Sequence, residues 1–161
     1  PDAKTGELVS QLNENHALEL EPDHILCVFR GSAGNMNIHF ARSRDGGRTW
    51  TRPEDIGVHG YPSYLIRLAA GPILCVFGDR RKPRAIRGLI SYDEGLTWDR
   101  ERILTLREFA YASDMGYPVA LEVAPGEVLC VYYSVPTPGQ ECFEQTDAAE
   151  AGILSTRIWL G

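Results

Sequence analysis

The chain reads Ser-Arg-Asp-Gly-Gly-Arg-Thr-Trp at residues 43–50 and Ser-Tyr-Asp-Glu-Gly-Leu-Thr-Trp at residues 91–98. Both stretches fit the pattern S-x-D-x-G-x-T-W, in which the aspartate can accept backbone N–H bonds within its own turn. The glycine gives the backbone freedom, and the tryptophan covers the edge of the adjoining strands. We therefore predict a structural role, joining two strands, for Ser43, Asp45, Gly47, Thr49, Trp50, Ser91, Asp93, Gly95, Thr97 and Trp98.

The two stretches belong to a longer repeat. The apolar run Ile25–Phe29 returns as Ile73–Phe77, an offset of 48 residues, and again more loosely as Val128–Tyr132. Short β-branched or aromatic runs separated by Gly, Pro and Asp turns favour four antiparallel strands per unit. In the second unit we expect strands at Tyr64–Ala69, Ile73–Phe77, Ala85–Ser91 and Thr97–Leu104.

A four-stranded unit of this length has the size of one β-propeller blade. The repeated S-x-D-x-G-x-T-W pattern resembles the Asp-box, or BNR repeat, of the sialidase (neuraminidase) superfamily. The resemblance implies an all-β fold, a β-propeller with three four-stranded blades per chain, which is half of a six-bladed sialidase-like propeller. We expect one domain over residues 1–161, with blades at about 12–58, 59–113 and 114–161 and an N-terminal strand at 6–11.

Composition narrows the function classes. The net charge of −6 argues against a nucleic-acid partner, because phosphate backbones demand clustered cationic surface. No apolar stretch approaches the roughly 20 residues that a membrane span needs. Cys27, Cys75 and Cys130 lie in apolar runs and are expected to be buried, whereas Cys142 lies in a polar stretch. No leader precedes Pro1, which favours the cytoplasm while leaving export open.

The order of strands locates the functional surface. In an up-and-down sheet, the turns after strands one and three share one edge, and the turn after strand two lies at the opposite edge. In sialidases the active site lies on the face away from the Asp-boxes. The segments expected on that face are 30–35, 59–63, 78–84, 114–119 and the residues from 133 onward.

A basic island stands on this face, with five cationic side chains within residues 80–87. Sialidases hold the substrate carboxylate with arginines, and guanidinium groups bind carboxylates in bidentate fashion. The resemblance therefore implies a substrate-binding site made by Arg30, His59, Tyr61, Arg80, Arg81 and Tyr133. A solvated loop, with no ligand, is the alternative interpretation of the island.

Sialidases also use a tyrosine nucleophile with a carboxylate partner. The resemblance makes Asp79, Asp114 and Tyr117 the catalytic candidates, with Glu14 entering the same face from the first unit. The alternative role for Tyr61 and Tyr117 is packing at the rim of the central funnel of the propeller. The four histidines are scattered without metal-ligand spacing, so we predict no metal and no cofactor.

The sequence thus predicts a sialidase-like propeller that recognises a carbohydrate or small anionic ligand in its central funnel, with exo-sialidase-like glycoside hydrolysis as one activity. A non-catalytic protein-interaction propeller and a C-terminal fragment of a longer sialidase-like protein are the alternatives. Three blades cannot close a ring, so we also expect a homodimer in which each strand at 6–11 completes the partner's third blade.

Overall fold

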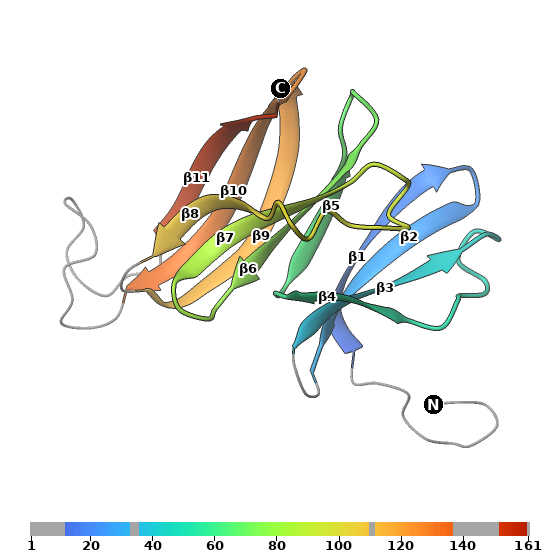
Figure 1. Ribbon diagram of the computed structural model, residues 1–161, viewed down its shortest axis with the longest axis horizontal. Helices are drawn as coiled ribbons and strands as arrows, with labels where there is room; N and C mark the ends of the chain where they lie inside the picture. The colour runs from blue at the N-terminus through green and yellow to red at the C-terminus, as the bar shows by residue number, and fades with distance from the viewer. Residues whose placement is uncertain (1–11, 33–35, 110–111, 137–151, 161) are drawn as a thin grey trace.

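The computed structural model describes residues 12–32, 36–109, 112–136 and 152–160. Within these residues the chain forms three antiparallel sheets that stand side by side (Figure 1). The all-β prediction is confirmed. The described residues contain no helix long and apolar enough to cross a membrane.

The three sheets follow one another along the chain. The first contains, in order, β1 (Leu12–Glu21), β2 (His24–Gly31), β3 (Asn37–Ser43) and β4 (Glu54–His59). The second contains β5 (Ser63–Arg67), β6 (Ile73–Asp79), β7 (Arg84–Ser91) and β8 (Leu104–Phe109). The third contains β9 (Ala112–Ala124), β10 (Glu127–Pro136) and β11 (Gly152–Trp159), in the order β11-β10-β9.

The repeat in sequence is also a repeat in strand register. The leucine at the second position of each apolar run pairs with a residue of the following strand, and these three partners are equivalent to one another. The pairs are Leu26 with Arg42, Leu74 with Ile90, and Leu129 with Arg157. The apolar runs therefore form the second strand of each sheet.

Alternation of side chains gives each of these strands two different faces. The Leu and Val of one run pack against the Ile, Cys and Phe, or their equivalents, of the next run. Leu26 and Val28 share one core cluster with Ile73, Cys75 and Phe77. Leu74 and Val76 share the other with Val128, Cys130 and Tyr132. The second sheet is thus buried on both faces, and the first and third sheets each have one face free within the described chain.

The cysteine prediction is confirmed for the three positions that the structure describes. Cys27, Cys75 and Cys130 are buried free thiols. Cys142 lies outside the described residues.

One detail of the predicted strands is wrong. The fourth strand of the second sheet begins at Leu104 and not at Thr97. The backbone N–H of Asp99 donates to the carbonyl of Ile90, at 2.9 Å, so the chain continues its turn beyond Trp98. The third sheet has three strands in the described part of the chain, and its predicted fourth strand was the segment 6–11 of a partner. The strand predicted at residues 6–11 lies outside the described residues.

The two repeated turns, at residues 43–50 and 91–98, are built alike, and we call them the first and second box turns. Asp45 Oδ1 accepts hydrogen bonds from Ser43 Oγ and from the N–H of Thr49, both at 2.8 Å. The N–H of Gly47 donates to Ser43 Oγ at 2.8 Å. The second box turn repeats these three bonds. Each aspartate therefore holds its own turn together.

The two box-turn tryptophans differ in their surroundings. Trp50 is 43% exposed, and its indole N–H donates to the carbonyl of Gly47 at 3.0 Å. Trp98 is 9% exposed and belongs to the core cluster between the first and second sheets. Its buried indole nitrogen has no hydrogen-bond partner among the described residues, unlike that of Trp50.

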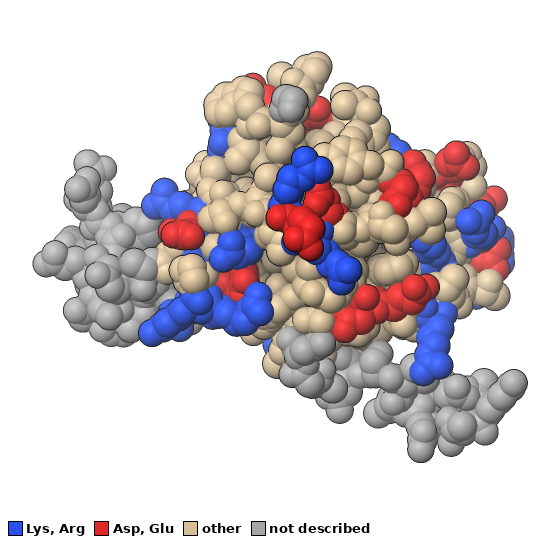
Figure 2. Space-filling model, viewed as in Figure 1, with Lys and Arg blue, Asp and Glu red and all other residues tan. Residues whose placement is uncertain are grey.

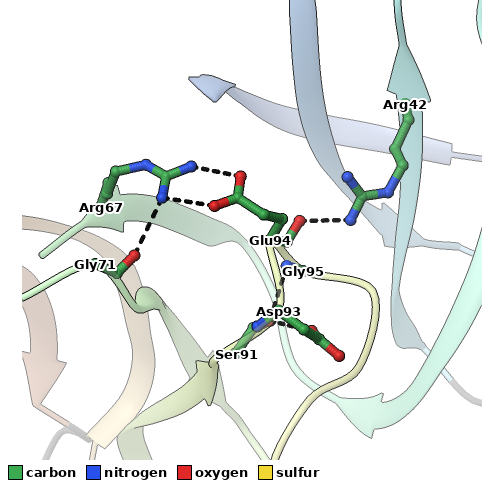
Figure 3. A network of polar contacts seen from close by, with 7 residues as sticks. All are labelled: Arg42, Arg67, Gly71, Ser91, Asp93, Glu94 and Gly95. Atoms are coloured by element: carbon green, nitrogen blue, oxygen red, sulfur yellow. Dashed lines mark hydrogen bonds and ion pairs between the residues drawn. The ribbon is translucent and has the colours of Figure 1, made fainter. Parts of the chain in front are cut away.

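A polar network links the second box turn to the first sheet (Figure 3). The guanidinium of Arg42, on β3, donates to the main-chain carbonyl of Glu94. Arg67, on β5, makes two hydrogen bonds to the Glu94 carboxylate, at 2.6 and 2.8 Å. The box turn is therefore anchored both to the first sheet and to the first strand of its own sheet.

We expect Asp93→Ala to lower the free energy of unfolding by about 1–3 kcal/mol at pH 7, because the turn loses several hydrogen bonds. Burial alone would raise the pKa of Asp93, but hydrogen bonds from Thr97 and Ser91 outweigh it and lower the pKa. The stabilisation is therefore present above pH about 4 and lost as the pH falls further. Urea unfolding at pH 7 and pH 3 tests this.

The exposed Glu101→Ala is the control and should leave stability unchanged at both pH values. If Asp93→Ala were as stable as the wild type at pH 7, the structural role of the box-turn aspartates would be refuted.

Candidate functional site

The predicted site residues lie at the edge of the sheets opposite the box turns. The first box turn lies beside the β1–β2 turn, where the N–H of Gly46 donates to the carbonyl of Asp23 at 3.0 Å. The other edge gathers the starts of β1 and β9, the segment before β5, and the ends of β2, β6 and β10. Strand β5 lies between β1 and β9. Three sheets therefore contribute residues to one surface.

At the centre of this surface, Tyr117 and Glu14 meet from the two outer sheets. The phenol of Tyr117 donates to Glu14 Oε1 at 2.5 Å. Both residues lie at irregularities where their strands step out of register with the neighbouring strand, and both have a φ of 47°. A positive φ is costly for residues other than glycine, and such strain gathers at functional sites.

Two arginines stand beside this pair. Arg30, at the end of β2, donates from Nη1 to Glu14 Oε2 at 2.9 Å. Arg80, after β6, lies 2.8 Å from Asp114 Oδ1. Both guanidinium groups stack on the ring of Tyr61, at 4.0 Å for Arg30 and 5.4 Å for Arg80. One aromatic ring thus holds two cations side by side.

Two further hydrogen bonds fix Arg80. Its Nε donates to the carbonyl of Met115 at 3.0 Å, and its Nη2 donates to the Tyr133 hydroxyl at 3.2 Å. The ring of Tyr133 lies 5.9 Å from that of Tyr117. The structure thus brings together Glu14, Arg30, Tyr61, Arg80, Asp114, Tyr117 and Tyr133, which we call the funnel cluster.

Asp79, Arg81 and His59 lie in a neighbouring group. Asp79 is 4% exposed and accepts two side-chain hydrogen bonds from Arg81, both at 3.0 Å, and one from Arg87 at 3.2 Å. His59 and these three residues line a cavity of about 170 Å³. Asp79 therefore ties the basic island to the end of its own sheet. Figure 2 shows basic side chains gathered over the β6–β7 turn, interspersed with acidic ones.

The hydrogen bond between Tyr117 and Glu14 shifts both acidities. Burial raises the pKa of Glu14, but the hydrogen bonds from Tyr117 and Arg30 outweigh it and lower the pKa. The hydrogen bond to the Glu14 carboxylate raises the pKa of Tyr117, and partial burial adds to this effect. At neutral pH the pair is therefore a protonated phenol held against an ionised carboxylate.

Tyr133 remains a neutral phenol over a still wider range. Burial and its hydrogen bond with Asp114 raise the pKa of Tyr133 to about 12. A cavity of about 200 Å³ adjoins the centre of the cluster, and its walls include Glu14, His16, Tyr64 and Tyr117. This cavity gives the Tyr117 hydroxyl a space that a ligand can enter.

One relation in this cluster escaped the sequence analysis. The sequence echo aligns Tyr61 with Tyr117, since both stand between Gly and Pro. The strand registers instead make Glu14 and Tyr117 equivalent, because Asn13 pairs with Arg30 and Gly116 pairs with Tyr133. The 48-residue offset places Glu14 at the position of Pro62, and this offset is what indicated that Glu14 lies on the same face as Tyr117.

No family model and no curated protein matches the chain. Among solved structures, the chain is similar to a protein of unknown function from Dyadobacter fermentans DSM 18053, with 27% sequence identity and a TM-score of 0.76. The match covers 93% of this chain and 38% of that protein. The chain therefore spans well under half the length of this structural relative.

We expect Glu14→Gln to lower the pKa of Tyr117 toward the ordinary tyrosine value of about 10, because the carboxylate charge that favours the protonated phenol is removed. NMR titration of ¹³C-labelled tyrosine measures the change, and Tyr117→Phe assigns the signal. Asp114→Asn is the matched control, since it should move the titration of Tyr133 and leave that of Tyr117 in place. An unaltered Tyr117 titration in Glu14→Gln would show that the two groups are not coupled.

Proposed function

We propose that this chain belongs to a sialidase-like β-propeller, that its funnel cluster binds a sugar carrying a carboxylate, and that Tyr117 attacks this sugar with Glu14 as proton acceptor. The single observation that carries the proposal is the 2.5 Å hydrogen bond from Tyr117 to Glu14 beside two arginines. A tyrosine with a carboxylate partner and a group of arginines is the set that the resemblance to sialidases implies.

The two arginines support the carboxylate-binding part of the proposal. Arg30 and Arg80 are held in place yet retain side-chain exposures of 23% and 30%. Each guanidinium has five N–H donors, and the contacts described above leave some of them for a ligand. A carboxylate between them would form charge-assisted hydrogen bonds. Arg81 is less suited to this role, because Asp79 holds it in the neighbouring group with His59 and Arg87 and not beside Tyr117 and Glu14.

The phenol–carboxylate pair supports the catalytic part. As the oxygen of Tyr117 bonds to the anomeric carbon, the bond from that carbon to the leaving oxygen breaks, the leaving oxygen takes a proton from solvent, and the phenolic proton passes to Glu14. Water then attacks the anomeric carbon and loses a proton to solvent, the tyrosyl oxygen leaves, and the proton on Glu14 returns to it. A neutral tyrosine suits this step, because a phenolate would repel the substrate carboxylate.

The contacts of Asp79 support a positioning role in place of the catalytic one that the resemblance implied. Burial raises the pKa of Asp79, but hydrogen bonds from Arg81 outweigh it and lower the pKa. A carboxylate held in its ionised form is a poor proton donor. We therefore propose that Asp79 positions the basic island, and that Asp114 positions Arg80.

The arrangement of the sheets supports the propeller. Three sheets in succession pack face to face, their first strands lie next to one another, and the box turns of the first two sheets share one edge. The alternative function, capture of a protein partner by the basic island, receives less support, because Asp79 engages both Arg81 and Arg87.

The test of the proposed function combines binding with turnover. Calorimetry with 2-deoxy-2,3-didehydro-N-acetylneuraminic acid should show binding that weakens at least about tenfold in Arg30→Ala/Arg80→Ala. Arg102→Ala, near the second box turn, is the control. The 4-methylumbelliferyl glycoside of N-acetylneuraminic acid should be hydrolysed, and Tyr117→Phe should lower kcat/KM by about 100-fold or more.

Tyr92→Phe is the matched control for turnover, since Tyr92 is an exposed tyrosine of the second box turn. If the double arginine variant bound the analogue as the wild type does, the assigned carboxylate site would be wrong. If Tyr117→Phe kept full activity, or if the wild type left the glycoside intact, Tyr117 would not be the nucleophile.

A further inference from the structure

The third sheet presents an uncovered apolar face. Val119, Leu121 and Val123 on β9 and Ile153 and Trp159 on β11 are all exposed large hydrophobic residues. Val131 and Leu129 of β10 pair with Val119 and Leu121, so they continue the same face across the middle of the sheet. An exposed apolar face that extends over three strands marks an interaction site, and here Ser155 and Arg157 stand on it between Ile153 and Trp159.

The corresponding face of each earlier sheet is covered by the sheet that follows it. By strand register, Leu129 and Val131 are equivalent to Leu26 and Val28 and to Leu74 and Val76. The first pair packs on Ile73, Cys75 and Phe77 of the second sheet, and the second pair packs on Val128, Cys130 and Tyr132 of the third. Two interfaces within the chain thus show which kind of sheet surface packs on a Leu and Val face.

The first sheet carries that surface, and no other described sheet packs on it, although Cys27 within it is only 5% exposed. Ile25, Cys27 and Phe29 are its equivalents of Ile73, Cys75 and Phe77. The box-turn tryptophans give the same indication. Trp98 is 9% exposed because it packs against the preceding sheet, whereas its equivalent Trp50, with no described sheet before it, is 43% exposed.

The polar contacts between sheets repeat as well. Arg42 of the first sheet donates to the Glu94 carbonyl in the box turn of the second (Figure 3). Arg157 of the third sheet occupies the register position of Arg42, and Gly46 of the first box turn occupies that of Glu94. Arg157 contacts Glu127 at 2.5 Å, and its side chain is 54% exposed, so a contact with a neighbour would replace or share this ion pair.

We propose that a second copy of this chain covers the free face of the third sheet with the free face of its first sheet, and that Arg157 of one copy donates to the Gly46 carbonyl of the other. Two such contacts, related by a twofold axis, would use up both free faces of both copies and close the assembly. The inference rests on the packing between sheets and is independent of the proposed activity.

Light scattering on the 161-residue chain, with no ligand present, tests this. At about 100 µM we expect twice the chain mass of 17.9 kDa. Leu121→Glu should give a monomer, because it places a charge within the apolar contact, and Arg157→Ala should weaken dimerisation by roughly tenfold. Leu96→Glu is the matched control, since Leu96 is 61% exposed and Leu121 is 63% exposed, and Leu96 lies on the second box turn.

Tryptophan fluorescence gives a second measurement. Dilution of the dimer should shift the emission to longer wavelength as Trp50 becomes exposed, and Trp50→Phe should abolish most of this shift. Two results would overturn the proposal. One is a folded monomer of the wild type at 100 µM, which would assign the free faces to a different partner. The other is a dimer that both Leu121→Glu and Arg157→Ala leave intact.

Discussion

The structure depends on one property of the second strand of each sheet. Its two faces differ, and one face of each strand packs against the opposite face of the equivalent strand in the next sheet. The runs Ile25–Phe29, Ile73–Phe77 and Val128–Tyr132 alternate between a narrow Leu and Val face and a bulkier face of Ile or Val, Cys and an aromatic residue. Both faces of such a strand are apolar, so both are buried only when another sheet packs on each side. Because burial of apolar area is the main favourable term in folding, this pattern dictates that the sheets stack in series.

The stacking also places the box turns and the funnel cluster at opposite edges of the sheets. At one edge, the box turns close the outer strand pairs with local hydrogen bonds, and the network around Glu94 ties one sheet to the next. At the other edge, strand ends from three sheets meet, and their side chains pair across the boundaries between sheets. The positive φ angles of Glu14 and Tyr117 lie at this second edge. The local hydrogen bonds of the box turns thus lie apart from the edge at which three sheets meet.

Much of this organisation could be predicted from the sequence. The repeat gave the three units and the edge at which Arg30, Arg80, Tyr117 and Tyr133 meet, because strand parity follows from turn positions alone. Contacts between distant residues could not be predicted. Glu14 and Tyr117 are separated by 103 positions, and only the stacking of the first and third sheets around β5 brings them within hydrogen-bond distance.

Contacts within the folded chain also explain where the sequence was misleading or uninformative. The fourth strand of the second sheet was placed too early, because Thr97 and Trp98 favour strands while the turn bonds to Asp93 and Ile90 hold them in a loop. The division of the basic island could not be predicted, because its arginines are adjacent in sequence. In the folded chain the carboxylates of Asp79 and Asp114 separate them into two groups.

The central claim is that the edge opposite the box turns is the ligand-binding edge. Amide NMR mapping of the chain with 2-deoxy-2,3-didehydro-N-acetylneuraminic acid tests it most directly. The account predicts the largest shift changes at residues 12–16, 30, 61, 80 and 114–117, with the signals of residues 43–50 and 91–98 unmoved. Changes centred on the box turns, or no saturable change at any described residue, would contradict it.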